Sequence, residues 1–327
     1  MGEAGGFEMR QNLLVLFFLV SLPLSALAQD GGYAGSELRL GLGARAVALG
    51  EAFAAVADDG SASFFNPAGA AWIEKKMFSA SYRVLEFDRR QGYLSLIFPL
   101  QKEAGIGFFW VHSSIGEIMG RDDIGQPTGE LNDHQNLFGF NFGKRFTKRF
   151  SLGANIKYLQ KVVVGVSAYS VAFDLGTQYK FKNFQMGNTA IPLAGLKIGA
   201  AVENIFARLS FNSNKYYGQF GSVGNTTIDT LPLNFRTGVS YLYREQLLVT
   251  LDVEKNSKQK AFFHAGGEYT FRKILALRTG YSHGQVSFGA GVRQPISPKQ
   301  ALRLDYAFKA SPISERGDHL FSLQFEF

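Results

Sequence analysis

The sequence predicts an exported all-β protein: a transmembrane antiparallel β-barrel of about fourteen strands, with an N-terminal segment that enters its lumen. Three observations support this fold class. The chain begins with the pattern of a secretory signal peptide, and from Met77 onward apolar and polar residues alternate. The last alternating segment also ends the chain on an aromatic residue, Phe327.

Residues 1–28 predict export and cleavage. They contain Arg10, an apolar run from Leu13 to Leu24 and the small-residue motif Ala26-Leu27-Ala28. The run is short for a spanning helix, which needs about 20 apolar residues, so a signal peptide cleaved after Ala28 is favoured over a membrane anchor. The chain has no cysteine, which excludes disulfides and a lipid-modified thiol.

Residues 29–76 are rich in alanine and glycine and show no alternation. Fourteen strands enclose more space than wall side chains fill, so we interpret this segment as a hatch that plugs the lumen, where small residues permit close backbone packing. A periplasmic helix followed by a linker is the alternative. Pro67 fixes its own φ and Asn66 can cap nearby amides, which predicts a tight turn there.

Residues 77–327 carry the pattern of the barrel. In the final segment, the apolar side chains of Phe321, Leu323, Phe325 and Phe327 share one face, as a strand between lipid and a polar lumen requires. An aromatic C-terminus of this kind also resembles the signal recognised by the barrel-assembly machinery. Strands are predicted to begin near Phe78, Gln91, Ala104, Asn132, Phe150, Val166, Leu196, Leu231, Gln246, Lys260, Ile274, Val286, Lys299 and His319.

The lengths of the connections indicate how the barrel is oriented. An even strand number places both termini in the periplasm, where connections are short, whereas external loops are longer. The predicted external connections 115–131, 206–230 and 309–318 are long, and most periplasmic ones are short. The connection 181–195 is periplasmic yet long, and several external turns are short, so the agreement is incomplete.

Composition excludes two other classes. After the signal peptide no 20-residue apolar stretch occurs, which argues against a helical membrane protein. The net charge of +7 comes from basic residues that are spread singly or in pairs. Such pairs suit turns near anionic headgroups better than a nucleic-acid stripe, so we expect outer-membrane lipid as a partner and no nucleic acid.

Motifs for cofactors, metals and catalysis are weak. Gly41-x-Gly43-x-x-Ala46 imitates a dinucleotide fingerprint, but no βαβ unit surrounds it. The five histidines lack HxH or HxxxH spacing, and the Asp58-Asp59 pair lacks a calcium-loop pattern, so we predict neither metal nor cofactor. Ser113 cannot act with its neighbour His112, because adjacent strand residues face opposite ways. No enzymatic activity is therefore predicted.

Charged residues on the predicted lumen face carry both signs. We interpret them either as a network that fills the barrel or as the lining of a polar conduit. They are Lys157, Asp174, Arg236, Asp252, Glu268, Arg278, Arg293, Arg303 and Asp305.

The segment GARAVALGEAFAAVADDGSASFFNPAGAA, with the later strand motifs AGGEYTF and LRLDYAF, resembles the PorV/PorQ family. The matching hatch residues are Gly43, Ala44, Arg45, Ala46, Gly50, Ala57, Asp58, Asp59, Ser61, Ala62, Asn66, Pro67, Ala68 and Gly69. That family is similar to FadL-type fatty acid transporters, which carry an N-P-A element in a hatch inside a fourteen-stranded barrel.

The resemblance implies two functions. The first is a non-enzymatic outer-membrane component of type IX protein secretion or surface attachment, with secretion-system subunits or secreted proteins as partners. Its working parts would be hatch residues 40–70 and the external loops, where Tyr216, Tyr217 and Phe220 would hold a partner. The alternative is a FadL-like transporter of hydrophobic small molecules, whose substrate passes the hatch near Asn66.

Overall fold

The computed structural model describes residues 34–100, 103–116, 118–186, 189–191, 193–218, 221–311 and 316–327. The predicted signal peptide, residues 1–28, and Phe220 lie outside the described residues. In the part of the chain that is described, none of the helices has the length and apolar character needed to cross a bilayer.

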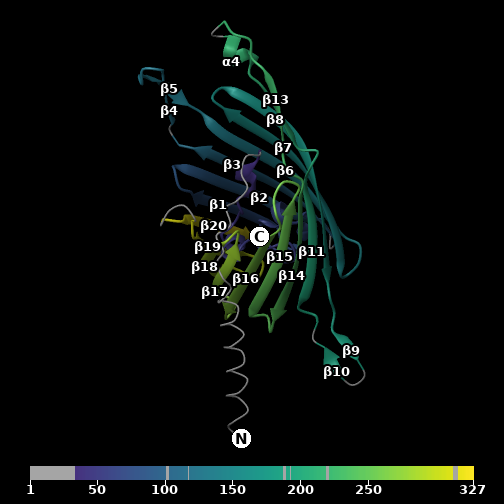
Figure 1. Cartoon of the computed structure of the whole chain (residues 1–327). Coiled ribbons are helices and arrows are strands. Elements are labelled where there is room, and N and C mark those ends of the chain that lie inside the picture. The colour runs from purple at the N-terminus through teal and green to yellow at the C-terminus, as the bar shows by residue number, and fades with distance from the viewer. Residues whose placement is uncertain are drawn as a thin grey trace. The chain divides into compact units, whose positions relative to one another are not determined.

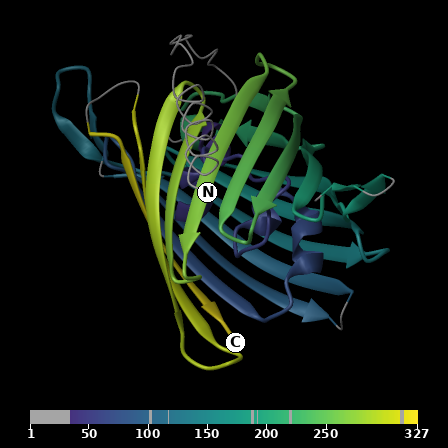
Figure 2. The ribbon, with the colours of Figure 1, turned by 90° about the horizontal axis from the view of Figure 1, so that it is seen from below.

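Fourteen antiparallel strands form a closed barrel, which confirms the predicted fold class (Figures 1 and 2). Strands β1 and β20 close it, with Met77 opposite Glu326. In order around the barrel, the strands are β1 (Met77–Val84), β2 (Arg89–Leu100), β3 (Ala104–Ile115), β6 (Asp133–Arg145), β7 (Phe150–Val163), β8 (Val166–Lys180), β11 (Leu196–Ile205), β14 (Asn234–Tyr243), β15 (Leu247–Asn256), β16 (Phe262–Phe271), β17 (Leu275–Ser282), β18 (Gln285–Pro295), β19 (Ala301–Lys309) and β20 (Asp318–Glu326).

Alternation along the strands separates an apolar outer face from a polar inner face. On β7, Leu152, Ile156 and Tyr158 are exposed on the outside, whereas Asn155 and Lys157 are buried inside. This arrangement follows from the period of two, because successive side chains of a strand point to opposite faces. The predicted strand starts differ from the observed ones by small offsets, the largest being Leu231 against Asn234.

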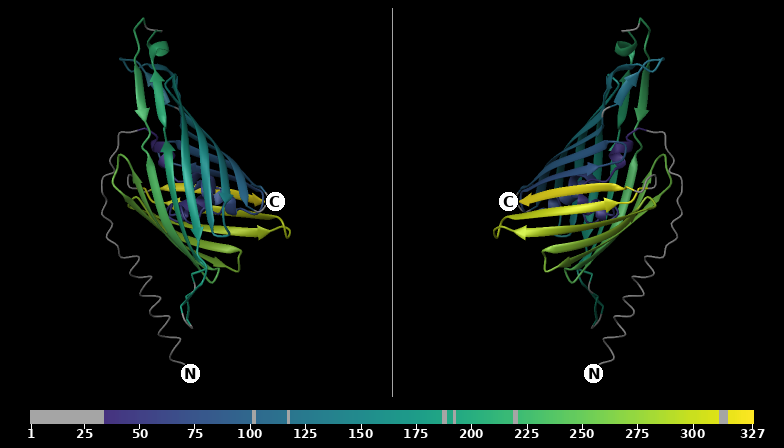
Figure 3. Two further views of the ribbon diagram at one scale, coloured as in Figure 1. Left: turned by 90° about the vertical axis from the view of Figure 1, so that its right-hand side faces the viewer. Right: turned by 90° about the vertical axis from the view of Figure 1, so that its left-hand side faces the viewer.

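We call the end of the barrel where β1 begins and β20 ends the terminal rim, and the opposite end the distal rim. At the distal rim two of the three long connections form hairpins rather than irregular loops, β4 (Ile118–Arg121) with β5 (Pro127–Leu131) and β12 (Arg208–Asn212) with β13 (Thr226–Thr230). Helix α4 (Asn214–Gly218) lies in the second (Figures 1 and 3). At the terminal rim, the connection 181–195 contains β9 (Phe184–Met186) and β10 (Thr189–Ile191).

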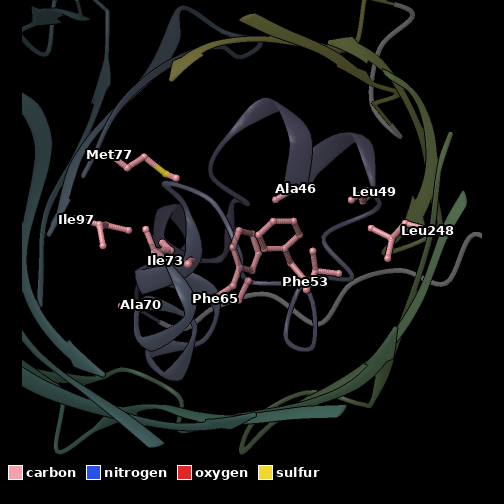
Figure 4. Packing of buried hydrophobic residues seen from close by; sticks show 12 residues of the cluster. Ala46, Leu49, Phe53, Phe65, Ala70, Ile73, Met77, Ile97 and Leu248 are labelled. Carbon is pink, nitrogen blue, oxygen red and sulfur yellow. The ribbon is translucent and has the colours of Figure 1, made fainter. Parts of the chain in front are cut away.

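Residues 34–76, the described part of the hatch, lie inside the ring of strands (Figure 4). They form the short helices η1 (Ser36–Arg39), α2 (Ala44–Ala48), α3 (Ala62–Phe65) and η2 (Pro67–Trp72). Phe53 and Phe65 lie at the centre with ring centroids 5.3 Å apart, and wall residues such as Ile97 and Leu248 join the same apolar cluster. Small side chains let the hatch backbone come close to the wall on all sides.

Candidate functional site in the barrel lumen

Polar wall side chains bind the hatch backbone directly. Asp252 on β15 accepts hydrogen bonds from the amides of Phe53 and Ala54, at 2.9 and 2.8 Å. On another part of the wall, Asn155 of β7 donates to the carbonyl of Ser63 at 2.7 Å. A buried backbone group without a partner costs about 1–3 kcal/mol, so these wall side chains stabilise an otherwise irregular segment.

Asn66 and Pro67 form the turn that the sequence predicts. Asn66 is fully buried, and its side chain accepts a hydrogen bond from Ala68 N while donating to the carbonyls of Ala54 and Thr177. Pro67 opens η2, where its missing N–H is not needed. The turn therefore ties two hatch segments to β8.

Gly50 of the hatch is in close backbone contact with the wall. Gly50 has φ 64°, and a Cβ there would lie 2.5 Å from backbone atoms of Ala265 and Tyr281. The wall residues at this contact are also glycines. A Cβ at Gly266 would lie 2.4 Å from a hatch carbonyl, and a Cβ at Gly280 would lie 2.0 Å from Gly50 N. Glycine is required on both sides of this contact.

Arg45 is the centre of a buried ion network between the hatch and strands β16 to β19. Its guanidinium contacts both carboxylate oxygens of Glu268, at 2.8 and 2.9 Å, and Asp58 at 2.5 Å. Asp59 contacts Arg303 at 3.1 Å, and Arg278 contacts Glu268 at 2.5 Å. Such bidentate, charge-assisted pairs fix geometry strongly.

The charges of the hatch members of this network support one another. Burial opposes the charge of Arg45, but Asp58 and Glu268 raise the pKa of its guanidinium well above the ordinary value. Burial likewise raises the pKa of Asp59, yet Arg303 and Arg45 lower it by more, so that its pKa lies below the usual range. Both groups are therefore charged at neutral pH.

A second polar cluster joins the hatch to the same wall, and no motif in the sequence predicted it. Glu51 contacts Lys309 Nζ at 2.7 Å, and His264 and His283 lie beside it with ring centroids 5.0 Å apart. Burial lowers the pKa of His283 to about 4. Burial raises the pKa of Glu51, but Lys309 and His283 outweigh it and hold that pKa well below the ordinary value.

The register of β16 and β17 explains why the two histidines meet. His264 is opposite Ser282, so the next residue, His283, comes beside it at the start of the following turn. Their separation along the chain matches no metal-binding motif, and the hairpin register alone could have revealed the pair.

A cluster of apolar side chains lies in the lumen on the distal side of the hatch. The hairpin of β12 and β13 with its flanking residues, 207–231, is called the distal extension. The cluster joins wall residues near the distal rim, such as Val111 and Leu159, to Leu209 and Leu231 of the distal extension, with Leu42 from the hatch. Its other buried members are Tyr93, Phe109, Leu137, Ala168, Ala172 and Ala207.

Two small cavities lie in the part of the lumen that the structure describes. One cavity of about 30 Å³ lies between η1, Phe65 and the charged groups Glu203, Arg236 and Glu254. Another, of about 20 Å³, lies next to Arg45. Each has room for only a few waters, which is too little for an organic solute.

The predicted site residues fall into three separate places. The hatch residues Gly43, Arg45, Gly50, Asp58, Asp59, Asn66, Pro67, Ala68 and Gly69 lie in the lumen. Tyr216 and Tyr217 lie on α4, and Phe321 and Phe327 are exposed on the outer face of the last strand or just after it. The charged residues predicted for the lumen include Glu268, Arg278 and Asp305, which are buried in the ion network.

No protein-family model and no curated protein sequence matches the chain. Solved structures do match: the toluene transporter TodX of Pseudomonas putida has a TM-score of 0.59 at 13% identity, covering 88% of this chain and 98% of that one. The chain shares its fold. The toluene transporter TbuX of Ralstonia pickettii has a TM-score of 0.58 at 13% identity, with the same coverage.

A FadL homologue of Pseudomonas aeruginosa has a TM-score of 0.56 at 13% identity, covering 86% of this chain and 97% of that one. Identities this low support a common fold alone. No family model supports the PorV/PorQ resemblance.

Proposed function

We propose that this protein is a FadL-like, non-enzymatic channel that carries small hydrophobic molecules across the bacterial outer membrane, with the hatch as its gate. The observation that carries the proposal is the division of the lumen. An apolar cluster lies in the distal half, and a hatch held by hydrogen bonds and ion pairs closes the path beyond it. The terminal rim then faces the periplasm and the distal rim faces the outside.

The apolar cluster suits a hydrophobic substrate because burial of apolar surface contributes about 25 cal/mol per Å² without demanding a specific partner. Leu209 and Leu231 belong to the distal extension, so their movement would expose Val111 and Leu159 to an incoming molecule. The solved neighbours with the same fold include toluene transporters, which agrees with a substrate of this chemistry.

Uptake of radiolabelled toluene and of a long-chain fatty acid tests the proposal in bacterial cells that lack their own channels for these compounds. Expression of this protein should accelerate uptake of at least one of them. Equal uptake with and without the protein, at verified surface levels of folded barrel, would reject the channel.

Crosslinking tests whether the hatch is the gate. Ala44 on α2 lies against β20, where its amide donates to Ser322 Oγ at 2.7 Å. Because the chain has no cysteine, Ala44→Cys with Ser322→Cys provides a unique pair for a short thiol crosslinker. The crosslinked barrel should lose uptake, while each single variant treated in the same way should keep it. Undiminished uptake in the crosslinked protein would reject gating by the hatch.

A second candidate function, attachment of a secreted protein, is favoured by apolar groups at the tips of the distal hairpins. Ile124 is 81% and Tyr217 46% exposed, and the rings of Tyr216 and Tyr217 lie 5.4 Å apart in a T-shaped arrangement. Purification from the native outer membrane with mass spectrometry distinguishes the two functions. Recovery of secretion subunits, lost in Tyr216→Ser with Tyr217→Ser, would support attachment, whereas a stoichiometric apolar ligand would support transport.

A further inference from the structure

Glu51, His264 and His283 bring three potential metal ligands together between the hatch and the wall. One ligand atom from each residue lies within 4.8 Å of the others. The residues come from three places: the hatch, strand β16 and the turn between β17 and β18. Ligand atoms around a tetrahedral Zn²⁺ are roughly 3.3 Å apart, so side-chain movements of about 1 Å would complete a site.

His264 has a ring nitrogen without a hydrogen-bond partner. Its Nδ1 lies 3.0 Å from the carbonyl of Gly50 and can only donate there, while Nε2 has no hydrogen bond although the side chain is buried. Nε2 also lies 3.3 Å from a carboxylate oxygen of Glu254. In a neutral imidazole the Nε2 lone pair would face that negative charge, so a positive charge between the two atoms, either a proton or a metal ion, is favoured.

The surroundings match those of known metal-binding histidines. Such a histidine usually donates its second ring N–H to a carbonyl or carboxylate, which fixes the tautomer that can bind metal. Gly50 provides this carbonyl to His264, and Ser282 Oγ lies 2.9 Å from Nδ1 of His283. Glu51 is held with φ 62°, a left-handed conformation that aims its side chain at the wall.

We propose that Glu51, His264 and His283 bind a divalent transition-metal ion of the zinc class, which locks the hatch to the barrel wall. Two imidazoles and one carboxylate suit Zn²⁺, with Glu254 or water available as a further ligand. Bonds from one ion to the hatch and to two wall elements would hold Glu51 in place. The ion would act as a removable clamp.

Lys309 is the cation that the metal must displace. Its ammonium contacts the Glu51 carboxylate at 2.7 Å and Ser282 Oγ at 3.3 Å. Metal binding therefore competes with an existing ion pair. Replacement of Lys309 by methionine should raise metal affinity, an effect opposite in sign to that of removing a ligand.

Zn²⁺ binding to the purified full-length barrel, folded in detergent without a histidine tag and stripped with chelator, tests the proposal. We expect one Zn²⁺ per chain by titration against a chromophoric chelator. Affinity should fall at least tenfold in His264→Gln and in His283→Gln, and rise in Lys309→Met. Amides near Gly50 should exchange with deuterium more slowly when Zn²⁺ is present.

His112 and His134 provide a matched control, because this second histidine pair lies on adjacent strands of the outer face with ring centroids 6.3 Å apart. The variant His112→Gln with His134→Gln should bind Zn²⁺ like the wild type. Binding that follows this outer pair, or no binding by a folded wild type, would overturn the proposal. Heat-modifiable migration in gels verifies that each variant is folded. Neither readout involves transport, so this proposal and the channel can fail separately.

Discussion

Replacement of Arg45 by methionine should loosen the hatch without unfolding the barrel. Arg45 makes a bidentate pair with Glu268 and a further contact with Asp58. Methionine keeps most of the side-chain volume but leaves these carboxylates without their hatch partner. The barrel strands make none of their ladder hydrogen bonds through this residue, so their pairing should survive.

The expected magnitude follows from burial. Removal of one partner from a buried ion pair costs about 3–5 kcal/mol. Glu268 retains Arg278, and the Asp58 side chain is 39% exposed, so water and the remaining arginine compensate in part. We therefore expect the lower limit, about 3 kcal/mol, which corresponds to a roughly hundredfold increase in the open fraction of the hatch.

Hydrogen–deuterium exchange measures this opening, because the amides of Phe53 and Ala54 are protected by their bonds to Asp252. Their exchange should accelerate about a hundredfold in Arg45→Met, by less in Arg45→Lys, and not at all in the exposed control Arg121→Met. Exchange at wild-type rates in a folded Arg45→Met barrel would refute the view that this network holds the hatch.

Three further predictions follow from single contacts. Gly266→Ala should lower the melting temperature and accelerate amide exchange in the hatch, because the new Cβ would lie 2.4 Å from a hatch carbonyl. Gly267→Ala should do neither, because a Cβ there would lie 4.0 Å from its nearest neighbouring atom. Asn66→Ala with Pro67→Ala should raise permeability to small solutes in planar-bilayer conductance, and unchanged conductance would count against a plug at this turn. Deletion of Phe327 should reduce the yield of assembled barrel in the outer membrane, and normal yield would argue against an assembly signal there.

Alternation was sufficient to predict the barrel wall because each strand is constrained on both faces. Leu152, Ile156 and Tyr158 must face lipid while Lys157 faces the lumen, and a slip of one residue would reverse both. The strand starts could therefore be predicted within a few residues. The distal hairpins could not, because β13 is exposed along its whole length and no burial imposes a period on it.

The contacts of the hatch could not be predicted, because they join residues far apart in the chain. Arg45 and Glu268 are separated by 223 positions, and no local pattern relates them. The sequence identified Arg45 as a hatch residue and Glu268 as a lumen residue, but their meeting depends on the register of many strands. The Glu51, His264 and His283 cluster was missed for the same reason.

The two sides of the hatch are attached by different chemistry, which predicts the order in which they release. On the β16 to β19 side, Asp59 and Arg45 rely on charge. On the β6 and β7 side, neutral groups suffice: Asn141 donates to the Pro67 carbonyl at 3.1 Å and Ser151 to the Ala68 carbonyl at 3.2 Å.

Acid should therefore open the charged side first. The pKa of Asp59 in the docked hatch lies below its ordinary value near 4, so its contribution is complete above that value and is lost as the pH falls further. Below about pH 4, amides of α2 should exchange before those of η2, and Asp59→Asn should reduce that difference in acid sensitivity without abolishing it, because Glu268 and Glu51 also pair with cations on this side. Simultaneous release of both helices would contradict a hatch that hinges about its neutral side.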